Sequence, residues 1–230
     1  MKEMLQNSVF FGVMISIFTY LIGVKLKQRF KMAILNPLLI AIVLTSVVLL
    51  SLNISYESYN EGAKYLSYLL TPATVCLSIS LYEQAELLKN NWKAVTVGIV
   101  SGVLTSLTCI LAMCLLFKMG HAEYVTLLPK SITTAIGIGV SEELGGYATI
   151  TASVIIITGI LGNMMAEGVC KIFRIKHPIA KGIAIGTASH AIGTAKAMEL
   201  GEIEGAMSSL SIAVSGLLTV VGASVFAQFL

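Results

Sequence analysis

Two segments of this chain carry ionisable residues within otherwise apolar sequence. Residues 135–145 and 191–201 share the pattern Ala-Ile-Gly, five variable residues, then Glu-Leu-Gly. Glu143 and Glu199 are the matched acids of the two copies, and His190 directly precedes the second copy. Ionisable side chains at membrane depth are costly and mark functional sites by default. We therefore predict that Glu143, Glu199 and His190 bind a coupling proton or cation.

Hydroxyl, glycine and basic residues gather around the same two segments. Half-helices that begin there would present unpaired amide donors to a ligand, and hydroxyl and cationic side chains would add to these donors. Such a set suits a small anion that bears a carboxylate. The predicted substrate-binding residues are Thr133, Thr134, Gly137, Ser189, His190, Gly193, Thr194 and Lys196.

Each of these features also has a structural interpretation. The two glutamates could cap helices at the membrane interface, and the glycines could simply let helices pack closely. Asn163 interrupts an apolar run, and an interhelical hydrogen bond is its predicted role. Ser189 and His190 are neighbours, which point in different directions on a helix, so they do not form a nucleophile and base pair. Catalysis, a metal and a cofactor are not expected.

The composition defines the protein class. Of the 230 residues, 56% are hydrophobic and only 12% are charged, and the mean hydropathy is +0.88. These values exclude a soluble globule with a polar shell and indicate an all-α integral membrane protein. The N-terminal apolar run lacks a small-residue cleavage site, so we expect it to be the first span. Candidate spans are 9–24, 34–52, 94–117, 146–166, 205–230 and a weaker one at 65–82.

The basic residues predict the topology. If residues 131–146 and the second motif segment each enter and leave on one side, ten of the fifteen basic residues fall on the cytoplasmic side. If both segments crossed fully, only about six would do so, and the positive-inside rule prefers the first arrangement. The first segment then enters from outside and the second from the cytoplasm, while 53–64 is an external loop. The ten residues are Lys25, Lys27, Arg29, Lys31, Lys89, Lys93, Lys171, Arg174, Lys176 and Lys181.

The predicted architecture follows from these observations. We expect one membrane domain over residues 1–230, with about six transmembrane helices and two broken or re-entrant segments in an inverted repeat. The repeat units are 131–172 and 187–228. A multi-pass protein of the bacterial cytoplasmic membrane is the expected location, with a homo-oligomer as the expected assembly and no nucleic-acid partner.

Several motifs resemble one family of membrane proteins. The stretch Gly186-Thr-Ala-Ser-His-Ala-Ile-Gly-Thr-Ala is the most specific, and Lys130-Ser-Ile-Thr-Thr-Ala-Ile-Gly-Ile, Glu143-Leu-Gly-Gly and Leu70-Thr-Pro-Ala-Thr-Val accompany it. Together they resemble the LrgB/CidB family of bacterial membrane proteins over essentially the whole chain. Ala135 stands where a proline often follows the paired threonines in that family.

The resemblance implies two functions. Family members are described as holin-like or antiholin-like regulators of murein hydrolase activity and cell lysis, usually with a small LrgA/CidA-type membrane partner. Relatives are also described as carriers of small monocarboxylates: pyruvate, glycolate or glycerate. Broken helices and intramembrane ionisable residues favour a secondary transporter whose substrate binds near the membrane midplane, coupled to protons or sodium. Lysis regulation is the alternative.

Overall fold

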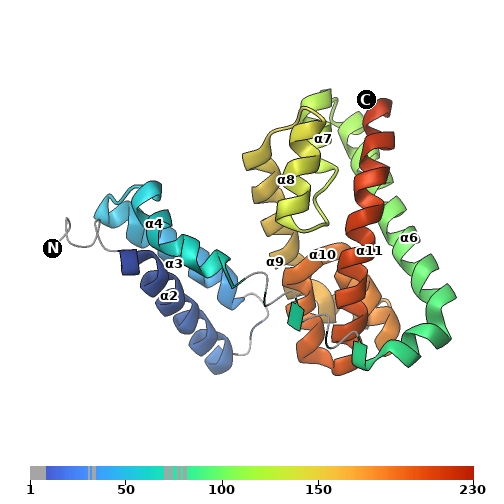
Figure 1. The fold of residues 1–230 in the computed structure, drawn as a ribbon, viewed down its shortest axis with the longest axis horizontal. Coiled ribbons are helices and arrows are strands. Elements are labelled where there is room, and N and C mark those ends of the chain that lie inside the picture. Colours follow the sequence, from blue (N-terminus) through green and yellow to red (C-terminus); the bar gives the residue numbers. More distant parts are fainter. Residues whose placement is uncertain are drawn as a thin grey trace. The chain divides into compact units, whose positions relative to one another are not determined.

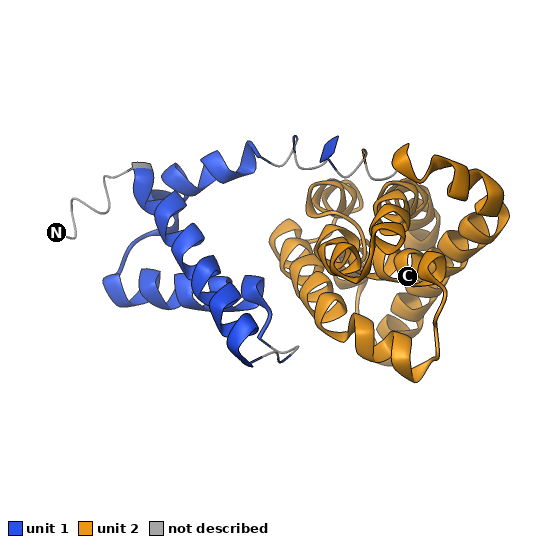
Figure 2. Cartoon of the chain, turned by 90° about the horizontal axis from the view of Figure 1, so that it is seen from below, with its two compact units in different colours: residues 1–76 blue, residues 77–230 orange. Residues whose placement is uncertain are grey.

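The computed structural model describes residues 9–30, 32, 35–69, 72, 75–76, 79 and 82–230. All regular secondary structure among these residues is helical, as the sequence predicts. The chain forms two compact units, residues 1–76 and 77–230 (Figure 2). Lys31 and much of the weak span 65–82, including Leu70 and Thr71 of the family motif, lie outside the described residues.

The first unit contains α2 (Val9–Phe30), α3 (Pro37–Leu52) and α4 (Tyr56–Ser67). Asn36 caps α3, because its side chain accepts from the amides of Leu38 and Leu39 at 2.9 and 3.2 Å. The helix ends at Asn53, which adopts the left-handed conformation with φ 51°. α2 and α3 are joined across their buried faces by a hydrogen bond of 2.9 Å between the hydroxyls of Thr19 and Thr45.

Helix α4 replaces most of the external loop that the sequence analysis expects at 53–64. Ser55 caps it, since its hydroxyl accepts from the amide of Ser58 at 3.3 Å. The helix then packs on α2, where Tyr59 hydrogen bonds with Ser16 at 2.8 Å. The polar composition of this segment predicts a loop. The same composition also fits the observed amphipathic helix, which packs one face on α2 and exposes the other.

The described residues of the second unit form six helices and a terminal 3-10 turn (Figure 1). They are α6 (Ala85–Leu116), α7 (His121–Leu127), α8 (Thr134–Glu143), α9 (Ala148–Ile172), α10 (Pro178–Leu200), α11 (Glu202–Phe226) and η1 (Ala227–Phe229). The buried apolar core joins α6, α7, the first half of α10 and α11, with Ile99, Leu107, Tyr124 and Met207 at its centre.

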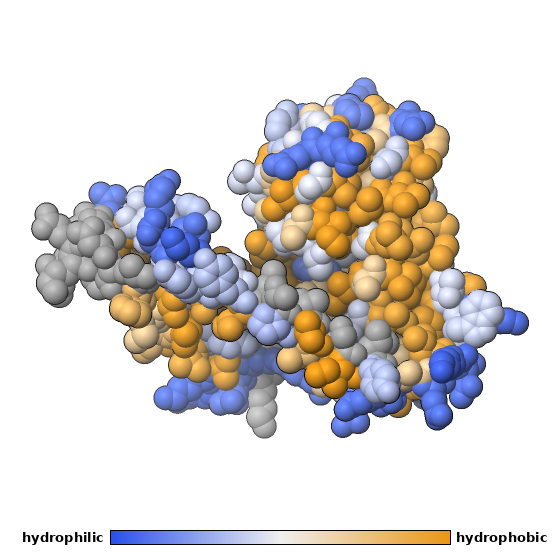
Figure 3. All heavy atoms as spheres, viewed as in Figure 1, coloured by the Kyte–Doolittle hydropathy of each residue, from blue (hydrophilic) through white to orange (hydrophobic). Residues whose placement is uncertain are grey.

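Four helices among the described residues are long and apolar enough to cross a membrane: Phe10–Phe30, Ala85–Leu116, Ala148–Ile172 and Glu202–Phe229. They cover all but one residue of each of the predicted spans 9–24, 94–117 and 205–230 and most of 146–166, while the predicted span 34–52 becomes the shorter apolar helix α3. In the second unit, apolar residues form a broad belt between hydrophilic residues at either end (Figure 3). The chain is a multi-pass membrane protein.

The first motif segment forms part of a short helical hairpin. α7 runs inward, residues 128–133 turn, and α8 returns. With 10 residues, α8 is about 15 Å long, too short to cross about 30 Å of hydrocarbon. Tyr147, which follows α8, donates its amide to the hydroxyl of Thr126 near the C-terminal end of α7 at 2.8 Å. Tyr124 donates to the carbonyl of Phe226 at 3.0 Å, which places this hairpin beside the C-terminal end of α11.

The second motif segment also turns back on itself. α10 breaks at His190, whose backbone has φ 42° and ψ −141°. Ile185 and Ala197 belong to one apolar cluster, although 12 positions of straight helix would separate them by about 18 Å. Gly205 lies against Met198, so this hairpin lies beside the N-terminal end of α11. The two hairpins therefore approach from opposite ends of α11, which is about 37 Å long.

Candidate functional site

His190 lies at the tip of the α10 hairpin and faces α9. The residue is 3% exposed, and its Nε2 hydrogen bonds with the carbonyl oxygen of Ile155 at 3.0 Å. A Cβ at Gly159 would lie 2.7 Å from His190 Cε1, so this glycine leaves room for the ring. The positive φ of His190 is unfavourable for a residue with a Cβ and persists because α9 holds the side chain. The bond to Ile155 makes the ring a well-fixed polar group in the middle of an apolar unit.

The residues around His190 are divided between two helix interfaces. Ser189 is buried and lies against Gly162 of α9. Thr194 donates to the carbonyl of His190 at 3.0 Å and shares a hydrogen bond of 2.7 Å with the hydroxyl of Ser208 on α11. Gly193 packs against Ile185 of the opposite arm of the hairpin. The predicted substrate-binding residues of the second segment thus stabilise the hairpin against its neighbours.

Lys196 and Glu199 lie nearer the base of the same hairpin. Lys196 forms ion pairs with Glu199, at 3.1 Å, and with Glu167 of α9, while 17% of its side chain is exposed. Glu199 is exposed. Glu204 is 7% exposed and pairs with Lys181 at 3.6 Å across α10 and α11. Within the described part of the chain, no group of three or more His, Cys, Asp or Glu side chains could hold a metal ion.

The first segment contributes a different set of residues. Thr133 is the N-cap residue of α8 and Thr134 its first residue, and both are half-buried. Gly137 is buried against Ile155, the residue whose carbonyl bonds His190. Glu143 is the last residue of α8 and is exposed. Ile155 therefore contacts residues of both motif segments, and the two segments pack along the same face of α9.

Asn163 joins α9 to the second arm of α10. Its Nδ2 donates to the carbonyl oxygen of Ile192 at 2.8 Å. The Ile192 carbonyl lies just past the break at His190, where the helical bonding pattern is interrupted. The amide of Asn163 therefore satisfies a backbone group near the tip of the hairpin.

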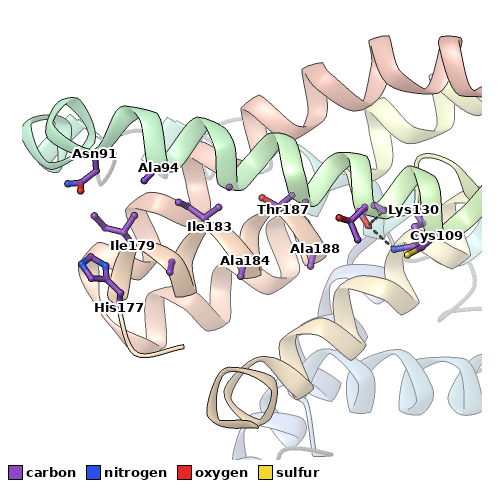
Figure 4. Close-up of a pocket in the computed structure, with 16 residues that line it drawn as sticks. Asn91, Ala94, Cys109, Lys130, His177, Ile179, Ile183, Ala184, Thr187 and Ala188 are labelled. Carbon is purple, nitrogen blue, oxygen red and sulfur yellow. Dashed lines mark hydrogen bonds between the residues drawn. The ribbon is translucent and has the colours of Figure 1, made fainter. Parts of the chain in front are cut away.

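A cavity of about 750 Å³ lies between α6 and the first arm of α10 (Figure 4). None of the predicted substrate-binding residues lines it. Three residues of the sequence motifs to which no role was assigned line this cavity: Lys130, Ser131 and Thr187. The sequence feature that could have indicated this cavity is Lys130, a lysine between two short apolar helices. The remaining lining residues are Asn91, Ala94, Gly98, Gly102, Thr105, Ser106, Cys109, His177, Ile179, Ala180, Ile183, Ala184 and Ala188.

Small residues let three helices approach α10 closely. A Cβ at Gly102 of α6 would lie 2.7 Å from the methyl group of Thr187. A Cβ at Gly186 of α10 would lie 2.8 Å from the Cα of Ser208 on α11. Close backbone approach through small residues is the usual way in which membrane helices associate. The first arm of α10 is therefore fixed between α6 and α11.

Comparison with known proteins gives a consistent result. The LrgB-like family matches residues 16–229. The Antiholin-like protein LrgB of Bacillus mycoides is 37% identical over 222 residues, which covers 96% of each chain. The proteins of the same name from Bacillus cereus and Bacillus anthracis match with the same identity and coverage. No solved structure matches the chain.

Proposed function

Because this chain belongs to the LrgB-like family, we propose that it is an antiholin-like membrane protein that regulates cell lysis. The observation that carries this proposal is the 96% coverage of both chains at 37% identity, which leaves neither protein with a large unmatched part. The relatives are named as antiholin-like proteins and not as enzymes. We further propose that it acts with a small LrgA/CidA-type membrane partner and that it forms homo-oligomers.

Autolysis of cells tests the lysis role. The full chain is expressed in a bacterium that lacks its own LrgB-type gene, with and without the small partner, and lysis after detergent addition is followed by turbidity. Murein hydrolase activity is read on gels that contain cell walls. We expect slower lysis and lower hydrolase activity than in cells with the empty vector. Unchanged lysis, with the protein present in the membrane fraction, would contradict the proposal.

A specific feature of the fold favours a second function, transport of a small monocarboxylate such as pyruvate, glycolate or glycerate. The broken helix α10 and the α7–α8 hairpin approach from opposite ends of α11. Non-helical backbone at membrane depth is tolerated where it is buried in protein or lines a wet cavity, and secondary transporters bind substrate at such breaks. We propose that the two hairpins are the re-entrant segments of an inverted repeat.

The polar residues at these hairpins would then serve the transport cycle. In this proposal His190, Glu143 and Glu199 bind the coupling proton or sodium ion, and the hydroxyl and basic residues of both motifs contact the substrate. Glu143 and Glu199 are exposed at the bases of the hairpins, where ions from water can reach them. His190 is buried at a tip, so any proton it takes up must pass the α9 interface.

Uptake into vesicles tests transport directly. The purified full chain is placed in proteoliposomes with an inward proton gradient, and uptake of labelled pyruvate and glycolate is measured for the wild type, His190→Ala and His121→Ala. His121 is exposed, which makes its substitution the matched control. We expect saturable uptake that His190→Ala abolishes and His121→Ala retains. Uptake that is equal in all three proteins would remove His190 from the transport site.

A further inference from the structure

The cavity between α6 and α10 is long and narrow. Its lining extends along α6 from Asn91 to Cys109, 18 positions or about 27 Å of helix. Figure 4 shows Asn91 and His177 at one end, Lys130 and Cys109 at the other, and Thr187 and Ala188 between them. The shape suits an extended chain better than a compact disc.

Lys130 supplies a positive charge at one end of the cavity. It lies in the turn between α7 and α8, is half-buried, and its Nζ donates to the hydroxyl of Ser131 at 2.9 Å. Among the described residues, no carboxylate oxygen lies within 4.0 Å of this ammonium group. An ammonium removed from water without a counter-charge is unfavourable, and an anion beside it would offset that cost.

Thr187 is the second observation that indicates a ligand. The residue is 5% exposed, and its hydroxyl has no hydrogen-bond partner among the described residues. Its methyl group faces Gly102, and the side chain lines the cavity. Buried hydroxyl groups in folded proteins are nearly always paired, and an unpaired one costs about 1–3 kcal/mol. A ligand oxygen in the cavity would satisfy this donor.

The middle of the cavity is apolar. Gly98, Ile183 and Ala184 line it, and Lys130 is the only lysine or arginine among the described residues of its lining. One carboxylate can pair with Lys130, whereas a second carboxylate within the apolar stretch would have no partner. The lining therefore favours a monoanion whose remainder is hydrocarbon.

We propose that this cavity binds a monocarboxylate with an alkyl chain. The carboxylate pairs with Lys130 and accepts from the hydroxyl of Thr187, and the alkyl chain lies along Gly98, Ile183 and Ala184 towards Asn91. The proposal rests on the transport function above. It moves the substrate from the motif residues named there to this cavity, and it makes an alkyl monocarboxylate the preferred substrate in place of pyruvate, glycolate or glycerate. It places that site along the first arm of α10, at a cavity that none of the residues chosen from the sequence lines.

Binding of hexanoate to the purified full chain in neutral detergent tests this proposal. Hexanol provides the same chain without the charge, and pyruvate provides the charge without the alkyl chain. Labelled hexanoate is titrated against the wild type, Lys130→Met, Thr187→Val and the control Lys89→Met, since Lys89 is exposed and does not line the cavity. Ala184→Leu, which fills the cavity and leaves the charges intact, is a further variant.

We expect saturable hexanoate binding that Lys130→Met weakens at least tenfold, that Thr187→Val weakens several-fold and that Ala184→Leu abolishes, with Lys89→Met unchanged. Without ligand, Thr187→Val should unfold at the same or a higher denaturant concentration than the wild type, because it removes an unpaired buried hydroxyl. Loss of binding together with equal or greater stability separates a ligand site from a structural role.

Other outcomes would overturn the proposal. Absence of saturable hexanoate binding, equal affinity in Lys130→Met, or equal binding of hexanol would each exclude recognition of an anion by Lys130. Pyruvate binding as tight as that of hexanoate would exclude the alkyl-chain preference. Flux is measured after the same purified proteins are placed in proteoliposomes, so the two proposals fail separately. Binding without uptake contradicts transport alone, and uptake that Lys130→Met leaves unchanged contradicts this site alone.

Discussion

The contact between α10 and α11 predicts that Gly186→Ala destabilises the protein, although alanine is the better helix former. A Cβ at Gly186 would lie 2.8 Å from the Cα of Ser208. Carbon atoms in favourable contact are about 3.5–4.0 Å apart, so the two helices would have to separate by about 1 Å. The obstacle is the backbone of α11, which cannot rotate away as a flexible side chain would.

The expected magnitude follows from two opposing effects. Overpacking of a well-packed interior costs about 1–3 kcal/mol, and replacing glycine by alanine within a helix gains about 1 kcal/mol. Gly168→Ala in α9 is the matched control, because nothing lies within 4 Å of a Cβ at Gly168. For Gly168→Ala, only the gain in helix propensity applies. The two variants should therefore differ by about 1–3 kcal/mol, or roughly 5-fold to 150-fold in the folding equilibrium constant.

Unfolding of the full chain by sodium dodecyl sulfate in mixed micelles measures this difference. Cys170 is buried in the folded protein, so its alkylation reports unfolding alongside the loss of helical signal. We expect Gly168→Ala to unfold at a higher detergent fraction than the wild type, and Gly186→Ala at a lower fraction than Gly168→Ala. If Gly186→Ala proved as stable as Gly168→Ala, α11 would be free to move and the account of α10 as a fixed arm would be wrong.

Three further predictions concern polar groups. Thr194→Val should lower the free energy of unfolding by about 1–3 kcal/mol in the same titration, because it removes the buried bond to Ser208, while Thr194→Ser should lose less. Glu167→Gln should change that free energy by less than about 1 kcal/mol, since 62% of the Glu167 side chain is exposed and its pair with Lys196 is weakened by water. A larger loss would contradict the assignment of this ion pair as weak. A cysteine in place of Lys176 should react with an impermeant reagent from the cytoplasmic side only, and external labelling would contradict the inverted arrangement of the two hairpins.

The long apolar helices could be predicted from the sequence because their signal is local. A run of apolar residues that is long enough to cross hydrocarbon needs no partner to be recognised, and α6, α9 and α11 all contain such runs. The short length of α8 was also predictable from residue count and glycine content. α4 was not predicted, because its polar residues become helical through Ser55 and the packing of Tyr59 on α2.

The tip of the α10 hairpin could be located only approximately. The repeated motif places its start at Ala191, and the reversal occurs at His190, where Ile155 and Gly159 of a different helix hold the ring. The roles assigned to Glu143 and Glu199 stay predictions. Both residues lie several positions from the turns, at the exposed bases of their hairpins.

The face of α10 that meets each neighbour could not be read from the sequence. Residues 182–195 are almost all small or apolar, so no polar side marks which face is exposed. Ser189 and Thr194 turn towards α9 and α11, whereas Thr187 lines the cavity beside α6. Because these hydroxyl residues have similar sequence surroundings, only the packing of the helices separates them.

The length of α6 determines from which side the cavity can be reached. Its 32 residues extend about 48 Å, roughly 18 Å more than the hydrocarbon layer. The surplus is at its start, where Glu86, Lys89 and Asn91 belong among lipid headgroups and water. The Asn91 end of the cavity therefore lies at the level of the headgroups. The cavity extends about 27 Å along α6 from there to Cys109, so its two ends lie at different depths in the membrane.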